Sequence, residues 1–314
     1  RSMIHAQQLT DLQLEQPSLV TIGVFDGVHR GHQLLIKKLV AEAHADGRLA
    51  VVLTFHPHPD TVLDSIPERY YLSTPDQRAQ LLGEMGVDVV ITHPFDDEVR
   101  NVRAKTFVAR LVKHLNMKCL RVGKDFALGY QREGDIDLLT SLGTQHDYEV
   151  QPIELLKAEI SAERVSSSAI RGFLQAGEIE KATSLLGRYY SVSGDVIEGD
   201  QRGRTIGFPT ANMAVWEKQV LPPNGVYAGW LTIGADTETR FMAATNIGIR
   251  PTFDGQTLSV EPYILDFDRT IYGETLTLSF VQRLRDEQKF DGLPALKAQL
   301  ATDIARTRDI LTDS

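Results

Sequence analysis

The sequence contains very little cysteine and no long hydrophobic run. Cys119 is the only cysteine among its 314 residues, so an intrachain disulfide is excluded and a reducing, cytoplasmic compartment is expected. No stretch reaches the roughly 18 consecutive apolar residues of a membrane span. No basic segment followed by an apolar one marks a secretory leader, and the GxxxxGK[ST] pattern of P-loop proteins is absent. We therefore expect neither a membrane partner nor a Walker-type nucleotide site.

Positive charge is also in short supply. The formal net charge is −9 and the isoelectric point is near 5.5, which argues against a nucleic-acid-binding protein with a basic surface. The hydrophobic fraction of 42% and the charged fraction of 24% are ordinary for a globular protein. A chain of this length can bury two separate cores, so two domains are expected.

The first half of the chain alternates apolar runs with segments of helical periodicity. This alternation predicts a doubly wound, parallel α/β sheet of the Rossmann-like kind. Such sheets bind ligands beyond the carboxyl ends of their strands. The expected strands are 19–25, 49–55, 87–92, 118–122 and 148–155, and the expected helices include 33–45, 75–83 and 104–115.

The segment from Leu19 to His32 contains the first candidate site. An apolar, β-branched run ends at Asp26 and Gly27, and a helix follows directly, so the free N–H groups of that helix favour a phosphate. His29 and His32 are three residues apart and can face the same ligand. Two solvated histidines at a helix start are the alternative, and a zinc site is disfavoured because only one thiol is available.

Three further segments of this half contain polar or glycine-rich loops. Thr54–Pro59 holds two histidines between prolines, which we interpret as a rigid wall in preference to ligands. Val122–Gly134 is a glycine-bounded loop after the fourth strand, and a plain surface loop is the alternative interpretation. Ser166, Ser167 and Ser168 with Arg171 combine capping hydroxyls, a helix start and a guanidinium, which predicts a second anion site or a plain capped helix.

The second half changes to short segments of period two separated by turn residues. This pattern predicts an antiparallel β-barrel followed by a terminal helix, whose apolar residues run from Leu293 to Leu311. The periodicity of apolar residues changes from helical to strand-like near residues 180–187, so we expect domains at 3–182 and 183–314. The expected strands are 191–197, 225–233, 240–247, 258–267 and 275–281.

A glycine-spaced, arginine-containing loop at 199–212 is the candidate site of this half. Backbone N–H groups of such a loop can surround phosphates. Thr210 and Asn212 offer oxygen ligands suited to a hard cation such as Mg²⁺. An ordinary hairpin loop is the alternative.

These motifs together resemble a known family over nearly the whole chain. FDGVHRGH at 25–32 resembles the HxGH motif of nucleotidyltransferases in its FMN adenylyltransferase form, and 123–129 resembles the flavin-contacting loop of that family, with Leu128 in place of an aromatic residue. SSSAIR at 166–171 resembles SSTxIR, with Ser168 in place of threonine. GRTIGFPTAN at 203–212 and the segment around Glu261 resemble riboflavin kinases. The chain is thus similar to bacterial bifunctional riboflavin kinase/FMN adenylyltransferases.

The resemblance implies two reactions and assigns residues to them. The second domain would phosphorylate riboflavin with ATP and Mg²⁺, with Glu261 as the base, and the first would adenylylate FMN to FAD, with His29 and His32 as catalytic residues. Riboflavin, FMN and ATP are the expected partners, and self-association is left open. The implied ATP-binding residues are Gly23, Phe25, Asp26, His29, Gly31, His32, Ser166, Ser167, Ser168, Arg171, Gly199, Arg204, Gly207, Pro209 and Thr210. The implied flavin-binding residues are Gly123, Asp125, Phe126, Arg132, Arg283 and Arg285, and the implied metal ligands are Thr210 and Asn212.

Two other functions compete with this interpretation. The first domain could adenylylate a different phosphorylated metabolite, since the fold does not specify the substrate. Alternatively, the chain could be a flavin-sensing or storage module without turnover. The presence of Glu261, Thr210, Asn212, His29 and His32 speaks against a module without turnover.

Overall fold

The structure is a computed structural model that describes residues 2–63, 66–153, 165–198, 210–252 and 255–313. The chain forms two compact units. Unit 1 contains Arg1–Pro67 and Ser73–Val165, and unit 2 contains Glu68–Leu72 and Ser166–Ser314. Among the described residues, no helix combines the length and the hydrophobicity that crossing a bilayer requires.

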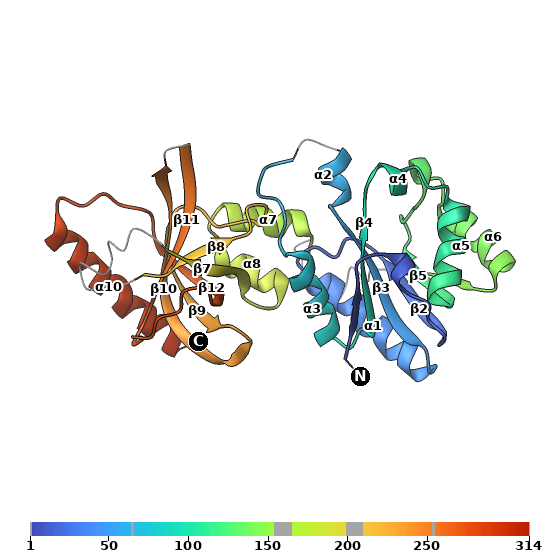
Figure 1. Ribbon diagram of the computed structural model, residues 1–314, viewed down its shortest axis with the longest axis horizontal. Helices are drawn as coiled ribbons and strands as arrows, with labels where there is room; N and C mark the ends of the chain where they lie inside the picture. The colour runs from blue at the N-terminus through green and yellow to red at the C-terminus, as the bar shows by residue number, and fades with distance from the viewer. Residues whose placement is uncertain (1, 64–65, 154–164, 199–209, 253–254, 314) are drawn as a thin grey trace. The chain divides into compact units, whose positions relative to one another are not determined.

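Unit 1 is built on a parallel sheet (Figure 1), as the sequence predicts, but the sheet has six strands because the short β1 was not among the five expected. The strand order is β1-β4-β3-β2-β5-β6. The chain runs outward from β2 through β3 to β4, and then returns to place β5 on the other side of β2. The carboxyl ends of β2 and β5 therefore form the switch point where such sheets bind ligands. The strands are β1 (Ile4–Ala6), β2 (Ser18–Ile22), β3 (Leu49–His56), β4 (Val89–Pro94), β5 (Met117–Gly123) and β6 (Glu149–Ile153).

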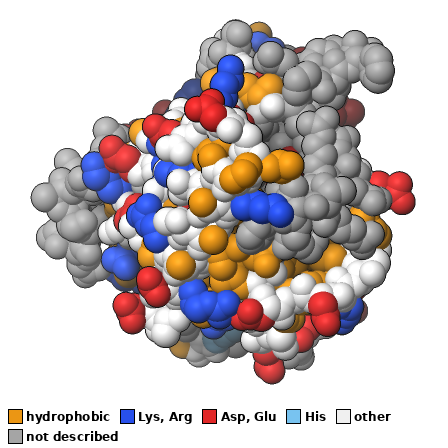
Figure 2. Space-filling model, turned by 90° about the vertical axis from the view of Figure 1, so that its left-hand side faces the viewer, with side chains coloured by type: hydrophobic (Ala, Val, Ile, Leu, Met, Phe, Trp, Pro, Cys, Tyr) orange, Lys and Arg blue, Asp and Glu red, His pale blue; other side chains and the backbone are white. Residues whose placement is uncertain are grey.

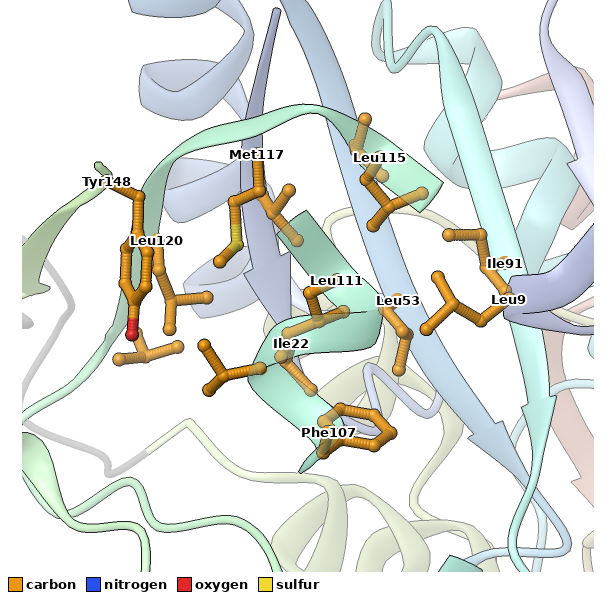
Figure 3. Packing of buried hydrophobic residues seen from close by; sticks show 14 of the residues in the cluster. Leu9, Ile22, Leu53, Ile91, Phe107, Leu111, Leu115, Met117, Leu120 and Tyr148 are labelled. Atoms are coloured by element: carbon orange, nitrogen blue, oxygen red, sulfur yellow. The ribbon is translucent and has the colours of Figure 1, made fainter. Parts of the chain in front are cut away.

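Helices cover both faces of this sheet. Successive strand residues point to opposite faces, so Val51 and Leu53 pack with Leu111 of α5, whereas Val52 packs with Ile36 of α1. Figure 3 shows the first of these two cores, with Leu53, Phe107 and Leu111 among its members. The helices are α1 (Arg30–Ala45), α2 (Pro59–Leu63), α3 (Pro75–Glu84), α4 (Asp97–Arg100), α5 (Ala104–Leu115) and α6 (Ile136–His146), with 3₁₀ turns at Leu9–Asp11 and Tyr130–Arg132.

The junction between β2 and α1 differs from the sequence-based expectation. The strand ends at Ile22 and not at Phe25, and the helix begins at Arg30 and not at Gln33. The cause is a run of left-handed backbone, with φ values of 51° at Phe25, 78° at Gly27 and 40° at Val28. Apolar residues after Ile22 therefore form a tight turn and not a continuing strand.

Unit 2 is a closed antiparallel barrel, which confirms the predicted fold class. Its strand order is β10-β11-β8-β7-β12-β9. Helix α10 (Leu293–Thr312) packs against β9, β10 and β12 on the outside of the barrel (Figure 1). The strands are β7 (Tyr190–Ile197), β8 (Asn212–Val215), β9 (Gly225–Ile233), β10 (Asp236–Thr252), β11 (Gly255–Ile264) and β12 (Thr275–Arg285).

Two short helices precede the barrel and belong to the same unit. Helices α7 (Ser167–Gln175) and α8 (Ile179–Leu186) pack on each other, and α8 also packs against β7 and β12. The two compact units thus meet along the chain at Val165/Ser166. The sequence analysis places the domain boundary at 182/183, because helical periodicity does not reveal which sheet a helix covers. The functional limits 3–182 and 183–314 remain predictions.

Candidate active sites

The two histidines of the first motif stack at the start of α1. His29 is the N-cap residue, and its Nδ1 accepts a hydrogen bond from the backbone N–H of His32 at 3.3 Å. The two imidazole rings are parallel to within 15°, with centroids 3.6 Å apart. The edge of Phe25 contacts His32 with ring centroids 5.1 Å apart. The pair therefore stands at the positive end of a helix dipole, where an anion is favoured.

The turn before this pair is held by hydrogen bonds from the segment before α3. The carboxylate of Asp26 is buried and accepts hydrogen bonds from the backbone N–H of Ser73 at 3.1 Å and from its hydroxyl at 3.2 Å. Gly27 N–H donates to the hydroxyl oxygen of Ser73 at 3.2 Å. Positive φ at the β-branched Val28 is a strained backbone conformation. Strain of this kind persists where the surroundings fix it, and is frequent at functional sites.

His32 is kept in its neutral form. Burial lowers the pKa of its imidazole well below the ordinary value of 6.5, and the neighbouring charges of His29 and Arg78 lower it further. A neutral imidazole still carries one N–H group, so it can donate to a phosphate oxygen. The pair can thus bind a polyphosphate without two adjacent positive charges.

A cavity of about 860 Å³ opens beside this turn, within unit 1. It lies at the carboxyl ends of the strands, at the switch point between β2 and β5. Most of its wall is apolar or aromatic, as in small-molecule binding sites. The lining residues include Gly23, Phe55, Phe95, Asn101, Phe126, Tyr130 and Arg132.

The predicted flavin loop forms one wall of this cavity. Asp125, Phe126 and Arg132 line it, whereas Gly123 does not. Arg132 donates a hydrogen bond to the backbone oxygen of Asp125 at 3.0 Å, which closes the loop on itself. Gly129 has a φ of 78°, and a Cβ there would lie 2.6 Å from the backbone nitrogen of Ala104. Only glycine allows this close approach.

The segment at Thr54–Pro59 contributes to the wall of the cavity. Phe55, Pro59 and Asp60 line the cavity. His58 is buried, and its Nδ1 accepts a hydrogen bond from the backbone N–H of Asp60 at 3.1 Å. This arrangement agrees with the interpretation as a rigid wall.

Sequence reasoning missed several cavity residues. Phe95 follows β4, Asn101 follows α4, and Tyr130 lies in a 3₁₀ turn. Phe95 and Asn101 come from segments without a recognisable motif, whereas Tyr130 lies inside the glycine-bounded loop Val122–Gly134 and was overlooked there. The rule that parallel strands end at the same edge of the sheet could have identified Phe95, which directly follows a predicted strand.

The serine motif belongs to unit 2. Ser166 caps α7, and its hydroxyl oxygen accepts a hydrogen bond from Ala169 N–H at 3.2 Å. Ser168 is exposed. The guanidinium of Arg171 lies 3.8 Å from the ring centroid of Tyr70, and its Nε donates to the backbone oxygen of Tyr70 at 2.7 Å. The role of this motif in ATP binding stays a prediction.

In the barrel, the structure places Glu261 opposite Asn212. Val260 pairs with Met213, and Ala211 N–H donates to the oxygen of Pro262 at 3.0 Å, so the antiparallel register sets Asn212 across from Glu261. Asn246 of β10 is the partner of Glu261 on its other side. Val260 and Ile264 are buried, whereas Glu261 and Tyr263 are partly exposed, which is the predicted alternation. Gly199, Arg204, Gly207 and Pro209 lie outside the described residues.

The two arginines of unit 2 that are predicted to bind flavin, Arg283 and Arg285, have protein partners in that unit. Arg285 forms a two-pronged ion pair with the buried Asp303 of α10, at 2.7 Å and 3.0 Å. Its charge therefore ties β12 to α10. Arg283 donates to the backbone oxygen of Asn224 at 2.8 Å and pairs with Asp286 at 2.9 Å. Their flavin contacts remain predictions.

The residues near Glu261 fit a cation that is carried mainly by phosphates. Within the described ranges, no group of three or more histidine, cysteine, aspartate or glutamate side chains could hold a metal. Thr210 and Asn212 are partly buried and offer neutral oxygen atoms beside Glu261. Mg²⁺ keeps several waters and binds through substrate phosphates with few protein ligands, so this donor set is suitable.

The outer face of the barrel on the α10 side combines apolar and charged side chains. Figure 2 shows hydrophobic side chains gathered in its middle, with lysine, arginine and acidic side chains around them. Leu293, at the start of α10, is 56% exposed. Apolar surface of this kind is frequent around ligand sites.

Comparisons with known proteins agree with both halves of the chain. Residues 11–169 match the family model of FAD synthetase, and residues 186–311 match that of riboflavin kinase. A bifunctional riboflavin kinase/FMN adenylyltransferase of Listeria monocytogenes is 37% identical, over 97% of this chain and 96% of its own. That of Escherichia coli is also 37% identical, over 94% and 93%, and that of Bacillus subtilis is 33% identical, over 91% and 90%.

One solved structure is similar over the full length. It is described as a macrolide-efflux protein of Streptococcus pneumoniae, and it superposes with a TM-score of 0.84 at 31% identity, over 98% of this chain and 99% of its own.

Proposed function

Because this chain belongs to the family of bifunctional riboflavin kinases/FMN adenylyltransferases, we propose how its residues divide the two reactions. The barrel domain phosphorylates riboflavin with ATP to give FMN, and the α/β domain transfers the adenylyl group of ATP to FMN, giving FAD and pyrophosphate. ATP is the co-substrate of both steps.

In the α/β domain, we assign the phosphates of ATP to His29 and His32. An oxygen of the FMN phosphate attacks the α-phosphorus, the bond from that phosphorus to the bridging oxygen breaks, and pyrophosphate leaves. His32 donates its N–H to the phosphates, and the free N–H groups at the start of α1 add to this stabilisation of charge. The lowered pKa of His32 supports a neutral donor. Catalysis of this kind needs positioning and electrostatics and no covalent enzyme intermediate.

The flavin ring of FMN occupies the cavity beside that turn in this proposal. The volume of about 860 Å³ is within the range of small-molecule sites. Phe55, Phe95 and Phe126 supply the apolar wall for the isoalloxazine ring, and Asn101 and Arg132 supply polar edges. Ser166 and Arg171 are proposed as a second binding site for the ATP phosphates.

In the barrel, we assign the role of base to Glu261. The ribityl hydroxyl of riboflavin gives its proton to this carboxylate while its oxygen attacks the γ-phosphorus and ADP leaves. The position of Glu261 between Asn212 and Asn246 supports the assignment. Thr210 and Asn212 would hold Mg²⁺, which neutralises charge between the phosphates when it is bound. A cytoplasmic location, expected from the single cysteine, stays a prediction.

The observation that carries the proposal is the stacked histidine pair on the turn between β2 and α1, whose first residues, Gly23 and Val24, line a flavin-sized cavity at the switch point of the sheet. The test is chromatography of the products formed from riboflavin, ATP and Mg²⁺, in which FMN should appear first and FAD afterwards. A chain that forms neither product is a flavin-sensing module. A chain that adenylylates other phosphorylated acceptors faster than FMN is a different transferase.

A further inference from the structure

Arg78 is a buried arginine beneath the proposed adenylyl-transfer site. It lies in the middle of α3 and is 0% exposed. One terminal nitrogen of its guanidinium donates to the backbone oxygen of Val24 at 2.5 Å and to the hydroxyl oxygen of Thr54 at 3.0 Å. The same nitrogen lies 3.4 Å from the backbone oxygen of Phe55. Burying a charge is costly, so an arginine in this position calls for a specific reason.

The acceptors of Arg78 lie at the ends of two neighbouring strands. Val24 starts the strained turn that leads from β2 to His29, while Thr54 and Phe55 lie near the carboxyl end of strand β3. The hydroxyl of Thr54 also donates to the oxygen of Val24, at 2.7 Å. Arg78 and Thr54 therefore fix the point at which the turn leaves the sheet.

The segment before α3 holds the other side of the same turn. Ser73 bonds Asp26 and Gly27, and Thr74 forms a reciprocal capping box with Gln77 that fixes the start of the helix. One short segment, from Ser73 to Arg78, thus forms hydrogen bonds to the turn at Val24 and at Asp26. These bonds hold the strained backbone of the turn in place.

We propose that Arg78 is a positioning residue for adenylyl transfer, which holds the turn between β2 and α1 in the geometry that presents His29 and His32 to the phosphates. The proposal rests on the assignment of these two histidines to the transfer step. Arg78 acts through the turn and does not touch the reacting atoms.

The charge of Arg78 gives the proposal a second observable. Within the described residues, the charges that act on His32 are those of His29, the N-cap residue of α1, and of Arg78 from α3, while the carboxylate of Asp26 on the turn is bonded by Ser73. Arg78 is one cause of the lowered pKa of His32, after burial and His29. Removing the positive charge should therefore let that pKa rise, whereas a purely mechanical support would leave it in place.

Three variants separate these possibilities. Arg78→Met removes both the hydrogen bonds and the charge, and Arg78→Lys keeps the charge without the planar fork. Arg121→Met is the matched control, because the side chain of Arg121 is also mostly buried in unit 1 but pairs with Glu42 and Gln151, away from the turn. Each variant is assayed for FAD formation from FMN against pH, for FMN formation from riboflavin, and for thermal stability. Histidine NMR in the full chain follows the titration of His32.

We expect Arg78→Met to lower kcat for FAD formation by roughly 10- to 100-fold, since misplaced groups cost rate of that order. The acid limb of its kcat/KM profile, and the titration of His32, should move up toward the ordinary value of about 6.5. Arg78→Lys should lose rate while keeping the parent acid limb. FMN formation by the barrel unit should be nearly unchanged in both variants, and the thermal melts report whether unit 1 is folded.

Two results would overturn the proposal. One is an Arg78→Met chain with the parent rate and the parent pH profile. The other is a rate loss no larger than that of Arg121→Met, with the titration of His32 unmoved. If Arg78→Met does not fold, Arg78→Lys decides by its rate alone. If His32→Ala forms FAD at the parent rate, the assignment of His32 is wrong. The effect of Arg78 on the turn is then decided by the comparison of Arg78→Met with Arg121→Met.

Discussion

The imidazole rings of His29 and His32 stack face to face, with centroids 3.6 Å apart. Two imidazolium ions at this separation would repel each other, so the pair cannot be doubly charged at low cost. The His29 N-cap bond to the backbone of His32 fixes the spacing. A pair built in this way offers directed N–H donors at a helix start, which suits phosphates that must be held while a bond to phosphorus is exchanged.

Removing the second ring should affect one reaction alone. His32→Ala is expected to lower FAD formation from FMN by roughly 10²-fold or more, because it removes one donor to the transition state. FMN formation from riboflavin should be nearly unchanged. Steady-state assays of both reactions on one preparation provide the measurement. An equal loss of both activities would point to misfolding or to a single shared site.

Acid should weaken unit 1 through two histidines whose pKa values are lowered in the folded chain. Burial lowers the pKa of His32 and of His93, and His93 Nδ1 accepts a hydrogen bond from Leu9 N–H at 3.2 Å. In the unfolded chain these histidines titrate near pH 6.5. Below that pH the unfolded chain therefore binds protons that the folded chain does not bind, and the free energy of unfolding decreases as the pH is lowered. Urea midpoints at about pH 7.5 and about pH 5.5 test this. The drop should be smaller in His93→Gln, and an equal drop in that variant would contradict the account.

The cavity should be specific for the flavin of the adenylyl-transfer step. Phe126→Ala removes an aromatic wall and should raise the KM for FMN by roughly 10-fold, in line with the loss of about 1–3 kcal/mol of apolar contact. The KM for riboflavin in the kinase step should not change. Leu138→Ala, at a 37% exposed position of α6, is the control. A KM for FMN equal to that of the parent would place the flavin elsewhere.

The barrel should fold alone when it is cut at the right place. A fragment that starts at Ser166 keeps α7 and α8, whereas one that starts at residue 183 removes Ile179 and Ala182, which are fully buried against the barrel unit. We expect both to phosphorylate riboflavin and the longer one to be more stable, as thermal melts will show. A shorter fragment as stable as the longer one would favour the boundary at 182/183.

The sequence predicted the fold class and most strands because periodicity reports burial. Val51, Val52 and Leu53 read as a buried strand, and they do pack on both faces of the sheet. It did not predict the end of β2, since Val24 and Phe25 are apolar and yet form a turn. The periodicity of apolar residues carries no information on a left-handed backbone conformation that is held by contacts with other segments.

The candidate sites were predictable only where a motif marks them. His29 and His32 stand in a recognisable pattern, and the structure brings them together. Arg78 looks like an ordinary charged residue in the middle of a helix, and only the structure shows that it is buried against Val24. Arg285 is the opposite case: its motif predicts a flavin contact, whereas in the structure its side chain forms an ion pair with Asp303.

The chain is proposed to have two separate sites, with Glu261 as the base of the kinase step. Glu261→Gln keeps the size of the side chain and removes the base, so riboflavin phosphorylation should fall by roughly 10²–10⁴-fold while riboflavin still binds. Chromatography of the flavins formed from riboflavin, and separately from FMN, measures both steps in this variant. The account predicts that FMN is still converted to FAD at the parent rate. Phosphorylation of riboflavin at the parent rate, or loss of FAD formation from supplied FMN, would contradict it.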